Sequence, residues 1–462
     1  MLTKQLEAVK LNEPVFTKAR AATSEARPHT PKPFSISVPD DQLEQLRQKL
    51  DLTRLPDELD LPAGQEWDWG IPLAVLKPVI DYWRTQYDWR AVEERINRTL
   101  PQFTTYVESK KHGEQEVHFV HKRSKSPNAV PLIFVHGWPG NFLEVSKIID
   151  DLVDPKDPKH PSFHVVAPSL PGYVFSQRAS TPGMNATGTA HLFNKLMQKL
   201  GYQQYVAQGG DWGALVVRAM AVHHQDTCLA THSNMNFIYP SPWKNPIMTL
   251  RSALGLAGLP GGYPKDEMDA LASSKEFQVT GAGMTKRANH KYLLKTLAVG
   301  LTDSPVGLLA WIGEKLHVWT DSYPWTPEEL ITWTMLYWIR GPAGGLRYYK
   351  ENSFIGSSEL LEEFNRLRFS WSPTLFGFSW FPKEVIGAPL EWAGIGQQLI
   401  YSKKHSRGGH FAAWEVPELL TNDIQEFVAI VLEKEPRLLN NYYDTMINNV
   451  NETRYKQSSL QY

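Results

Sequence analysis

A single carboxylate at a sharp turn is the residue of this sequence best placed for chemistry. Asp211 stands in GGDWG, between the apolar run QYVA and the helical pattern ALVVRAMAVHH. A strand, a turn flanked by small residues and a helix are typical of a nucleophile elbow, whose central residue is usually Ser. Gly209 and Gly213 permit the backbone crowding of such a turn. A carboxylate needs no base at neutral pH, so Asp211 is suited to SN2 attack on a saturated carbon, which leaves an alkyl-enzyme ester. Taken alone, the motif equally fits an Asp that caps a helix.

An earlier strand end offers groups that could stabilise negative charge. The apolar run VPLIFV leads into HGWPG at residues 136–140, where elbow hydrolases place part of their oxyanion hole. We expect the main-chain N–H groups of Trp138 and Trp212 to stabilise the oxyanion that forms when water attacks the ester carbonyl.

A histidine and an acid follow the elbow in the chain order of elbow hydrolases. His410 comes after a double glycine that follows the apolar run QQLIY, and it would deprotonate the water that hydrolyses the ester. The acid is expected in the loop after the preceding strand. Glu384, in FGFSWFPKEVIGAP, is preferred over Glu391 because it directly follows the apolar run FSWF. It would orient His410 and stabilise its imidazolium.

These residues need a scaffold, and the apolar runs predict one. Runs that end in Gly-rich turns (VPLIFVHG, FHVVAPSLPG, QQYVAQGG) alternate with helix-like segments, which favours a parallel sheet covered on both faces. EVHFVHKR alternates like a strand, and residues 43–50 and 72–98 read as amphipathic helices. After residue 240 the strand signals fade until LEWAGIGQQLIYS, and the Trp- and Tyr-rich helical interval predicts an inserted lid.

Composition excludes several classes of protein. The chain has 462 residues, of which 42% are hydrophobic, and this suffices for a sizeable core. A net charge of −1 gives no electrostatic footprint for nucleic acid or acidic membranes. Cys228 is the single cysteine, which excludes an intramolecular disulfide and cysteine-built zinc or iron–sulfur sites. Residues 1–30 lack the apolar run of a secretory signal, and we expect no membrane-spanning helix and a cytoplasmic location.

The motifs together resemble the microsomal-type branch of the epoxide hydrolases, within the α/β-hydrolase superfamily. The resemblance covers about residues 33–435, and its landmarks occur in order: HGWPG, PSLPGY, GGDWG, LTDSPVGLLAWI, RYYKEN, FPKE and GGHFAAWEVPELL. It implies an α/β-hydrolase fold of class α/β, with a mostly parallel sheet, a helical lid and an N-terminal extension. The expected parts are an arm (1–32), an N-terminal domain (33–125), a core in two pieces (126–239 and 371–438), a lid (240–370) and a tail (439–462).

The resemblance also implies roles for site residues. Asp211 corresponds to the nucleophile, His410 to the base and Glu384 to its partner. The family uses two lid tyrosines that hold and protonate the epoxide oxygen. Tyr349 in RYYKEN matches the second, with Tyr348 as the neighbouring alternative. The position expected for the first holds Lys286, and the nearest tyrosine is Tyr292.

The leading hypothesis is hydrolysis of an apolar or aromatic epoxide to a vicinal diol, without a metal or organic cofactor. Three alternatives stay open: an epoxide-opening cyclase in which a substrate hydroxyl replaces water, a haloalkane dehalogenase in which Trp212 binds halide, and a catalytically silent binder of small molecules. We expect no nucleic-acid partner and no integral membrane anchor, and a homodimer is left open.

Overall fold

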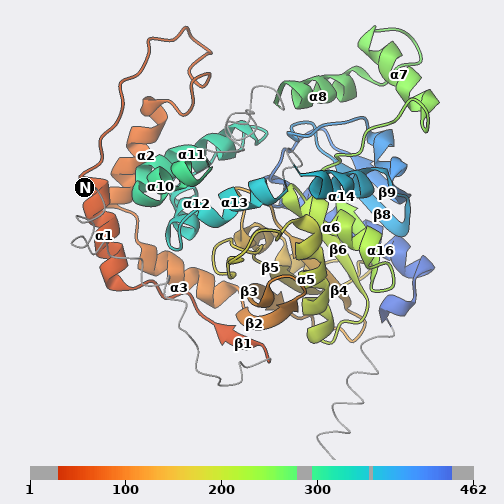
Figure 1. Cartoon of the computed structure of the whole chain (residues 1–462), viewed down its shortest axis with the longest axis horizontal. Coiled ribbons are helices and arrows are strands. Elements are labelled where there is room, and N and C mark those ends of the chain that lie inside the picture. The colour runs from red at the N-terminus through yellow and green to blue at the C-terminus, as the bar shows by residue number, and fades with distance from the viewer. Residues whose placement is uncertain (1–29, 278–293, 353–356, 440–462) are drawn as a thin grey trace, which may run out of the picture.

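A mostly parallel β-sheet forms the centre of the molecule (Figure 1). The computed structural model describes residues 30–277, 294–352 and 357–439. Within these ranges the sheet has nine strands, in the order β1-β2-β3-β5-β4-β6-β7-β8-β9. Neighbours from β1 to β5 in this order pair antiparallel, and those from β5 to β9 pair in parallel. The strands are β1 (Lys32–Phe34), β2 (Gln102–Ser109), β3 (Gly113–Lys122), β4 (Val130–Val135), β5 (Phe163–Pro168), β6 (Tyr205–Gly209), β7 (Cys228–Ser233), β8 (Ser372–Trp380) and β9 (Gln397–Lys404).

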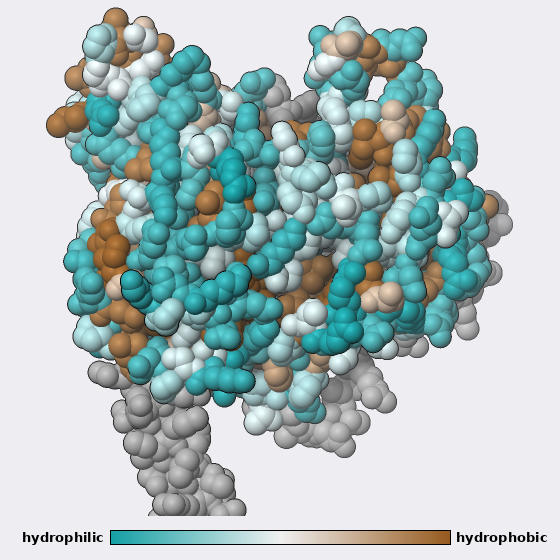
Figure 2. All heavy atoms as spheres, turned by 180° about the vertical axis from the view of Figure 1, so that it is seen from behind, coloured by the Kyte–Doolittle hydropathy of each residue, from teal (hydrophilic) through white to brown (hydrophobic). Residues whose placement is uncertain are grey.

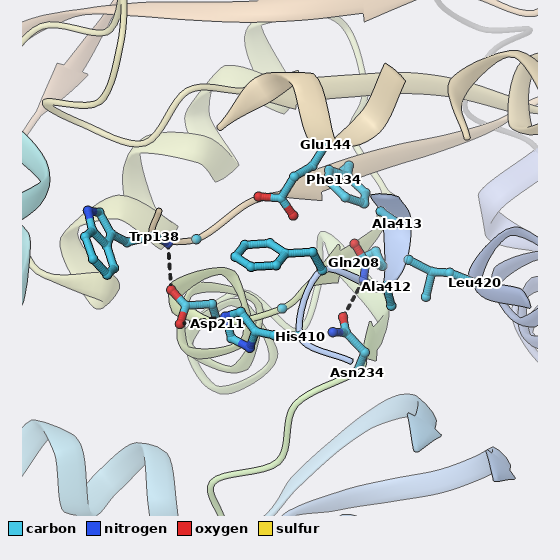
Figure 3. A pocket seen from close by; sticks show the side chains of 13 residues that line it. Phe134, Trp138, Glu144, Gln208, Asp211, Asn234, His410, Ala412, Ala413 and Leu420 are labelled. Carbon is cyan, nitrogen blue, oxygen red and sulfur yellow. Dashed lines mark hydrogen bonds and ion pairs between the residues drawn. The ribbon is translucent and has the colours of Figure 1, made fainter. Parts of the chain in front are cut away.

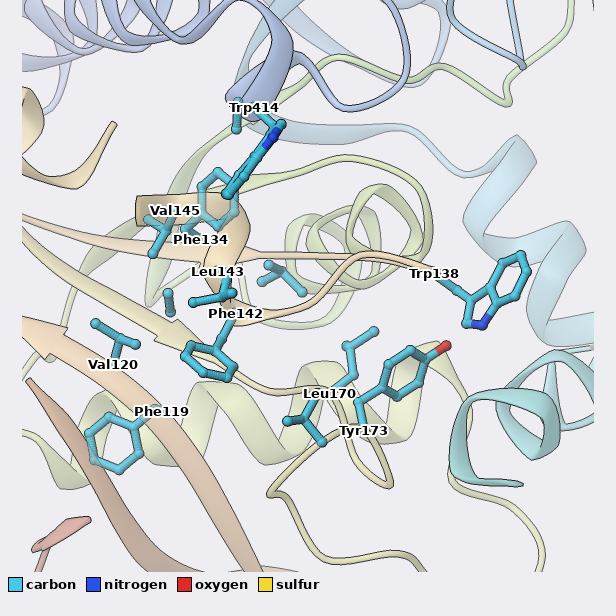
Figure 4. Close-up of a cluster of buried hydrophobic side chains, with 14 of the residues drawn as sticks. Phe119, Val120, Phe134, Trp138, Phe142, Leu143, Val145, Leu170, Tyr173 and Trp414 are labelled. Atoms are coloured by element: carbon cyan, nitrogen blue, oxygen red, sulfur yellow. The ribbon is translucent and has the colours of Figure 1, made fainter. Parts of the chain in front are cut away.

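The central strands are buried along their whole length because helices cover them. Every residue of β4, β5, β6 and β7 is buried, as parallel strands between helical layers require. Two pairs of contacting helices pack on the strands: α5 (Ala186–Lys199) with α6 (Trp212–His223), and α4 (Ile149–Val153) with α16 (Pro417–Lys434). The short α15 (Ala412–Glu415) and the 3-10 helix η1 (Phe142–Lys147) pack beside the second pair, since α15 contacts α16 and η1 contacts α4. Figure 4 shows Phe142, Leu143 and Val145 of η1 packed into the hydrophobic core.

A run of helices lies between β7 and β8 in the chain. They are α7 (Pro246–Leu256), α8 (Lys265–Glu276), α10 (Leu294–Asp303), α11 (Pro305–Val318), α12 (Pro327–Trp338), α13 (Ala343–Glu351) and α14 (Ser358–Phe369). None of the residues of α7 is buried, and this helix projects from the body (Figure 1). Figure 2 shows apolar residues gathered in patches on the otherwise hydrophilic rear face.

The strand expected over LEWAGIGQQLIYS was wrong in its first half. Residues Leu390–Ile395 form the 3-10 helix η3, and β9 begins only at Gln397. The reason is local packing, because η3 turns the side chain of Trp392 into a cluster with Tyr239 and Tyr263. The strand expected before Glu384, at the run FSWF, is present as β8 (Ser372–Trp380).

The N-terminal segment contacts both the sheet and the helices of the interval. β1 pairs with β2 at the sheet edge, and the chain continues through α1 (Asp40–Asp51), α2 (Leu73–Thr85) and α3 (Trp89–Thr99). Helix α1 packs on α11, and α2 packs on α12 (Figure 1). Gln42 Nε2 donates a hydrogen bond of 2.6 Å to the carbonyl oxygen of Ile339. The predicted domain boundaries stay predictions, and the arm and the tail lie almost wholly outside the described residues.

Among the described helices, none taken singly combines the length and apolar character needed to cross a bilayer. One pair, Thr296–Asp303 with Pro305–Val318, meets those criteria jointly but is bent by 109°.

Candidate active site

The elbow is a strained turn that only glycines on either side can accommodate. Asp211 links β6 to α6 with a φ of 50° and a ψ of −126°, a conformation that non-glycine residues rarely adopt. A Cβ on Gly213 would lie 2.0 Å from the carbonyl oxygen of Val135, and one on Gly209 would lie 2.6 Å from the backbone of Gly213. The side chain of Asp211 makes no cap hydrogen bond to α6, so it is not a helix cap.

The HGWPG loop holds one oxygen of this carboxylate. His136 fixes the loop, because its Nδ1 donates to the carbonyl oxygen of Gly137 (2.8 Å) and its Nε2 accepts from the N–H of Leu170 (3.1 Å). Burial lowers the pKa of His136 to about 4, which keeps the imidazole neutral for these bonds. The main-chain N–H of Trp138 then donates to Asp211 Oδ1 at 2.8 Å (Figure 3).

The other oxygen faces a buried histidine. His410 Nε2 lies 3.3 Å from Asp211 Oδ2, and His410 Nδ1 lies 2.6 Å from Glu384 Oε1. Glu384 comes from the loop after β8 and His410 from the loop after β9. The main-chain N–H of His410 donates to the carbonyl oxygen of Trp319 at 3.0 Å. Burial by itself would lower the pKa of His410, but the charges and hydrogen bonds of Glu384 and Asp211 raise it well above its usual value.

The structure separates the two candidate tyrosines of α13. The ring of Tyr349 packs edge-on against Trp138 (5.5 Å between centroids) and Trp212 (4.8 Å), beside the elbow. Burial and the charge of Asp211 raise the pKa of Tyr349 well above its usual value, so its hydroxyl stays protonated. The hydroxyl of Tyr348 instead bonds Thr189 Oγ1 at 2.9 Å.

Other predicted positions lie elsewhere or stay predictions. Glu391, the acid not chosen, pairs with Arg251. The hydrogen bond expected from the Trp212 N–H stays a prediction. Tyr292 and Lys286 lie outside the described residues. In the ranges that are described, no three His, Cys, Asp or Glu side chains are grouped so that they could hold a metal ion.

Sequence reasoning missed two buried groups next to the site. Glu144 of η1 lines the same cavity as Asp211 and His410, and the hydroxyl of Tyr337 donates to the carbonyl oxygen of Gly140 at 2.6 Å. A Glu in the mixed segment NFLEVSK reads as a surface residue, and a Tyr in an apolar helix reads as core. No sequence signal distinguished either from those ordinary roles.

This arrangement suits a carboxylate nucleophile. One oxygen is held by a main-chain donor and the other is directed toward the imidazole. If Oδ2 attacked a carbon, Oδ1 would become the ester carbonyl oxygen and would already have its donor in place. The paired imidazole could then activate water for hydrolysis of that ester.

Two protein families match the chain. Residues 31–145 match the family described as epoxide hydrolase N terminus, and residues 130–256 match the alpha/beta hydrolase fold. The chain is 36% identical to Epoxide hydrolase 1 of Oryctolagus cuniculus, over 87% of this chain and 89% of that protein. The structure of Aspergillus niger epoxide hydrolase aligns with a TM-score of 0.73 and 30% identity, covering 86% of this chain and 96% of the other. The crystal structure of juvenile hormone epoxide hydrolase from Bombyx mori aligns with a TM-score of 0.78 and 27% identity, covering 88% of this chain and 96% of the other.

The match to Epoxide hydrolase 1 of Oryctolagus cuniculus thus spans more than four fifths of both chains. With that coverage and an N-terminal domain of the epoxide hydrolase type, this chain belongs to the microsomal-type epoxide hydrolases of the α/β-hydrolase fold.

Proposed function

We propose that the enzyme converts an epoxide to a vicinal diol in two steps through an ester on Asp211. In the first step, Asp211 Oδ2 bonds to an epoxide carbon from the side opposite the ring oxygen. The carbon–oxygen bond of the ring breaks, and the released oxygen takes the hydroxyl proton of Tyr349. Tyr292 is the proposed second donor to this oxygen.

The second step hydrolyses the ester. Esterification removes the charge of Asp211, and with it one of the two carboxylates that raise the pKa of His410. Neutral His410 then takes a proton from water, the water oxygen bonds to Asp211 Cγ, and the Trp138 N–H stabilises the oxyanion on Oδ1. When the bond to the alkyl oxygen breaks, that oxygen takes the proton of the new carboxyl group. His410 then carries one extra proton and Tyr349 lacks one, so the net transfer of a proton from His410 to Tyr349 restores the enzyme.

One observation carries this proposal: the two oxygens of Asp211 have different partners. Oδ1 accepts from Trp138 at 2.8 Å, whereas Oδ2 lies 3.3 Å from the His410 imidazole. A carboxylate that only capped a helix would bond the N–H groups of that helix instead. The asymmetry supports a nucleophilic oxygen and a separate carbonyl oxygen.

Aromatic rings around Asp211 support an apolar or aromatic epoxide as substrate. Trp138 contacts Trp311 and Trp319 as well as Tyr349. We expect styrene oxide to have a kcat/KM at least about tenfold above that of glycidol, because the rings offer apolar contact that glycidol cannot use. Equal values for the two epoxides would contradict this substrate class.

The mechanism is tested by a single turnover in heavy-oxygen water, with enzyme in excess over styrene oxide. The first diol should contain an unlabelled oxygen from Asp211, and the label should appear in the enzyme carboxylate. In His410→Gln the ester should accumulate, and intact-protein mass spectrometry would show the added mass of one epoxide. Label in the first diol, or no ester in either protein, would overturn the proposal. An epoxide substrate that carries its own hydroxyl group should also yield the diol. If the product were instead a cyclic ether that has incorporated no water, the enzyme would be a cyclase.

A further inference from the structure

Glu144 is a buried carboxyl group that the two steps described above leave without a role. It stands in η1 and is 9% exposed. Within the described part of the chain, its Oε1 atom has no hydrogen-bond partner. Buried polar atoms are normally paired, because an unpaired one has lost its water without a replacement. Glu144 therefore needs an explanation that packing does not supply.

The neighbouring turn is shaped around this carboxyl group. A Cβ on Gly140 would lie 1.6 Å from Glu144 Oε1 and 2.7 Å from its Cδ, so no other residue type fits at position 140 while the carboxyl stays in place. The hydroxyl of Tyr337 fixes the same turn through the carbonyl oxygen of Gly140. The carboxyl position is thus held by two separate features of the loop.

The carboxyl faces the reacting groups. Glu144, Asp211, His410 and Gln208 line one cavity of about 20 Å³, which is the space that a single water occupies. Figure 3 shows the Glu144 carboxyl directed from η1 toward the side on which Asp211 and His410 lie. Burial raises the pKa of Glu144 to about 8, with His410 lowering it and Asp211 raising it. These charges act on one another across the cavity.

We propose that Glu144 is a further catalytic residue, whose Oε1 accepts a hydrogen bond from the water that hydrolyses the Asp211 ester. This inference rests on the two-step function proposed above. A water in the cavity would give one hydrogen to His410 Nε2 and hold the other against Glu144 Oε1, which aims its oxygen lone pair at Asp211 Cγ. The proton transferred goes to His410. The second hydrogen stays on the oxygen that joins the new carboxyl group.

The role predicts an effect on one step only. Glu144→Leu keeps a similar volume but removes both acceptor oxygens, so hydrolysis of the ester should slow about 10- to 100-fold. Ester formation needs no water and should stay within about threefold of the wild-type rate. Glu144→Gln retains one acceptor oxygen and should recover part of the loss. Gly140→Ala should slow hydrolysis as Glu144→Leu does, since the added methyl group displaces the carboxyl.

The experiment resolves the two steps in the full-length protein with styrene oxide. Rapid quenching and intact-protein mass spectrometry give the rates of ester formation and loss, and thermal unfolding shows which variants are folded. Glu363→Leu is the matched control, because Glu363 is a half-buried carboxyl that bonds His223 and Thr187 in a different cavity. It should leave both rates unchanged.

Several outcomes would overturn the role of Glu144. They are a wild-type rate of ester loss in folded Glu144→Leu, an equal slowing of both steps, and no recovery in Glu144→Gln. If Glu144→Leu does not fold, the rates of Glu144→Gln and Gly140→Ala decide, and unchanged ester loss in both refutes the proposal. Absence of any ester in the wild-type protein would instead refute the two-step function itself.

Discussion

One methyl group at Gly137 should disable the nucleophile. A Cβ at this position would lie 2.2 Å from Asp211 Oδ1 and 2.3 Å from Asp211 Cβ. Ordinary contacts between carbon atoms need about 3.5 Å, so the Gly137→Ala change must move the carboxylate or the loop by about 1 Å. The same shift breaks the bond from the Trp138 N–H. A misplacement of about 1 Å costs about 10²-fold in rate.

The assay is the single-turnover rate of ester formation, together with the melting temperature. Gly137→Ala should lower this rate by at least about 10²-fold, because Oδ2 no longer points at the substrate carbon. The matched control is Gly300→Ala in α10, where a Cβ meets no described atom within 4 Å. It should keep the wild-type rate. A folded Gly137→Ala protein that forms the ester within threefold of wild type would refute the geometry assigned to the elbow.

Three further predictions follow from the same structure. Tyr349→Phe should slow ester formation about 10²-fold by removing the proton donor. Tyr348→Phe should leave the rate of ester formation nearly unchanged, because that hydroxyl bonds Thr189. Equal rates in the two variants would contradict this assignment. Since the pKa of His410 is raised in the folded protein, its pairing stabilises the fold below the unfolded-chain value of about 6.5 and loses this effect as the pH rises through the folded-state pKa. The melting temperature of wild type should therefore exceed that of His410→Gln by less at high pH than near neutral pH. A difference in melting temperature that stays constant or grows as the pH rises would contradict a raised pKa of His410. Asp423 is fully buried and accepts from His405 (2.6 Å), Ser379 (2.5 Å) and Tyr401 (2.9 Å), so Asp423→Asn should lower the free energy of unfolding in urea by about 3 kcal/mol without slowing ester formation in the folded fraction.

The local parts of the site could be predicted from the sequence because local backbone geometry restricts which residue types fit there. Gly209 and Gly213 mark the elbow because a Cβ on either residue would lie within 3 Å of neighbouring backbone atoms. The α/β class and the presence of helices between β7 and β8 follow from runs of apolar residues and their spacing. Chain order then placed a histidine and an acid at successive strand ends.

Long-range packing was not accessible in the same way. Glu144 is buried because η1 folds over the HGWPG turn, and nothing in its neighbours along the chain signals that contact. Adjacent residues of a helix point about 100° apart, so the choice between Tyr348 and Tyr349 depended on how α13 is rotated. The contact of α1 and α2 with the helices α11 and α12 joins segments more than 200 residues apart, which no local pattern reveals.

That contact decides which piece of the protein can be exchanged with a relative. Because α1 and α2 supply the surfaces on which α11 and α12 rest, a chimera that imports Pro305–Trp338 alone would place foreign side chains against native partners. The transferable unit is instead discontinuous and comprises these helices together with the N-terminal pair. Recombination libraries aimed at substrate range would keep more folded members if their crossover points respected this coupling.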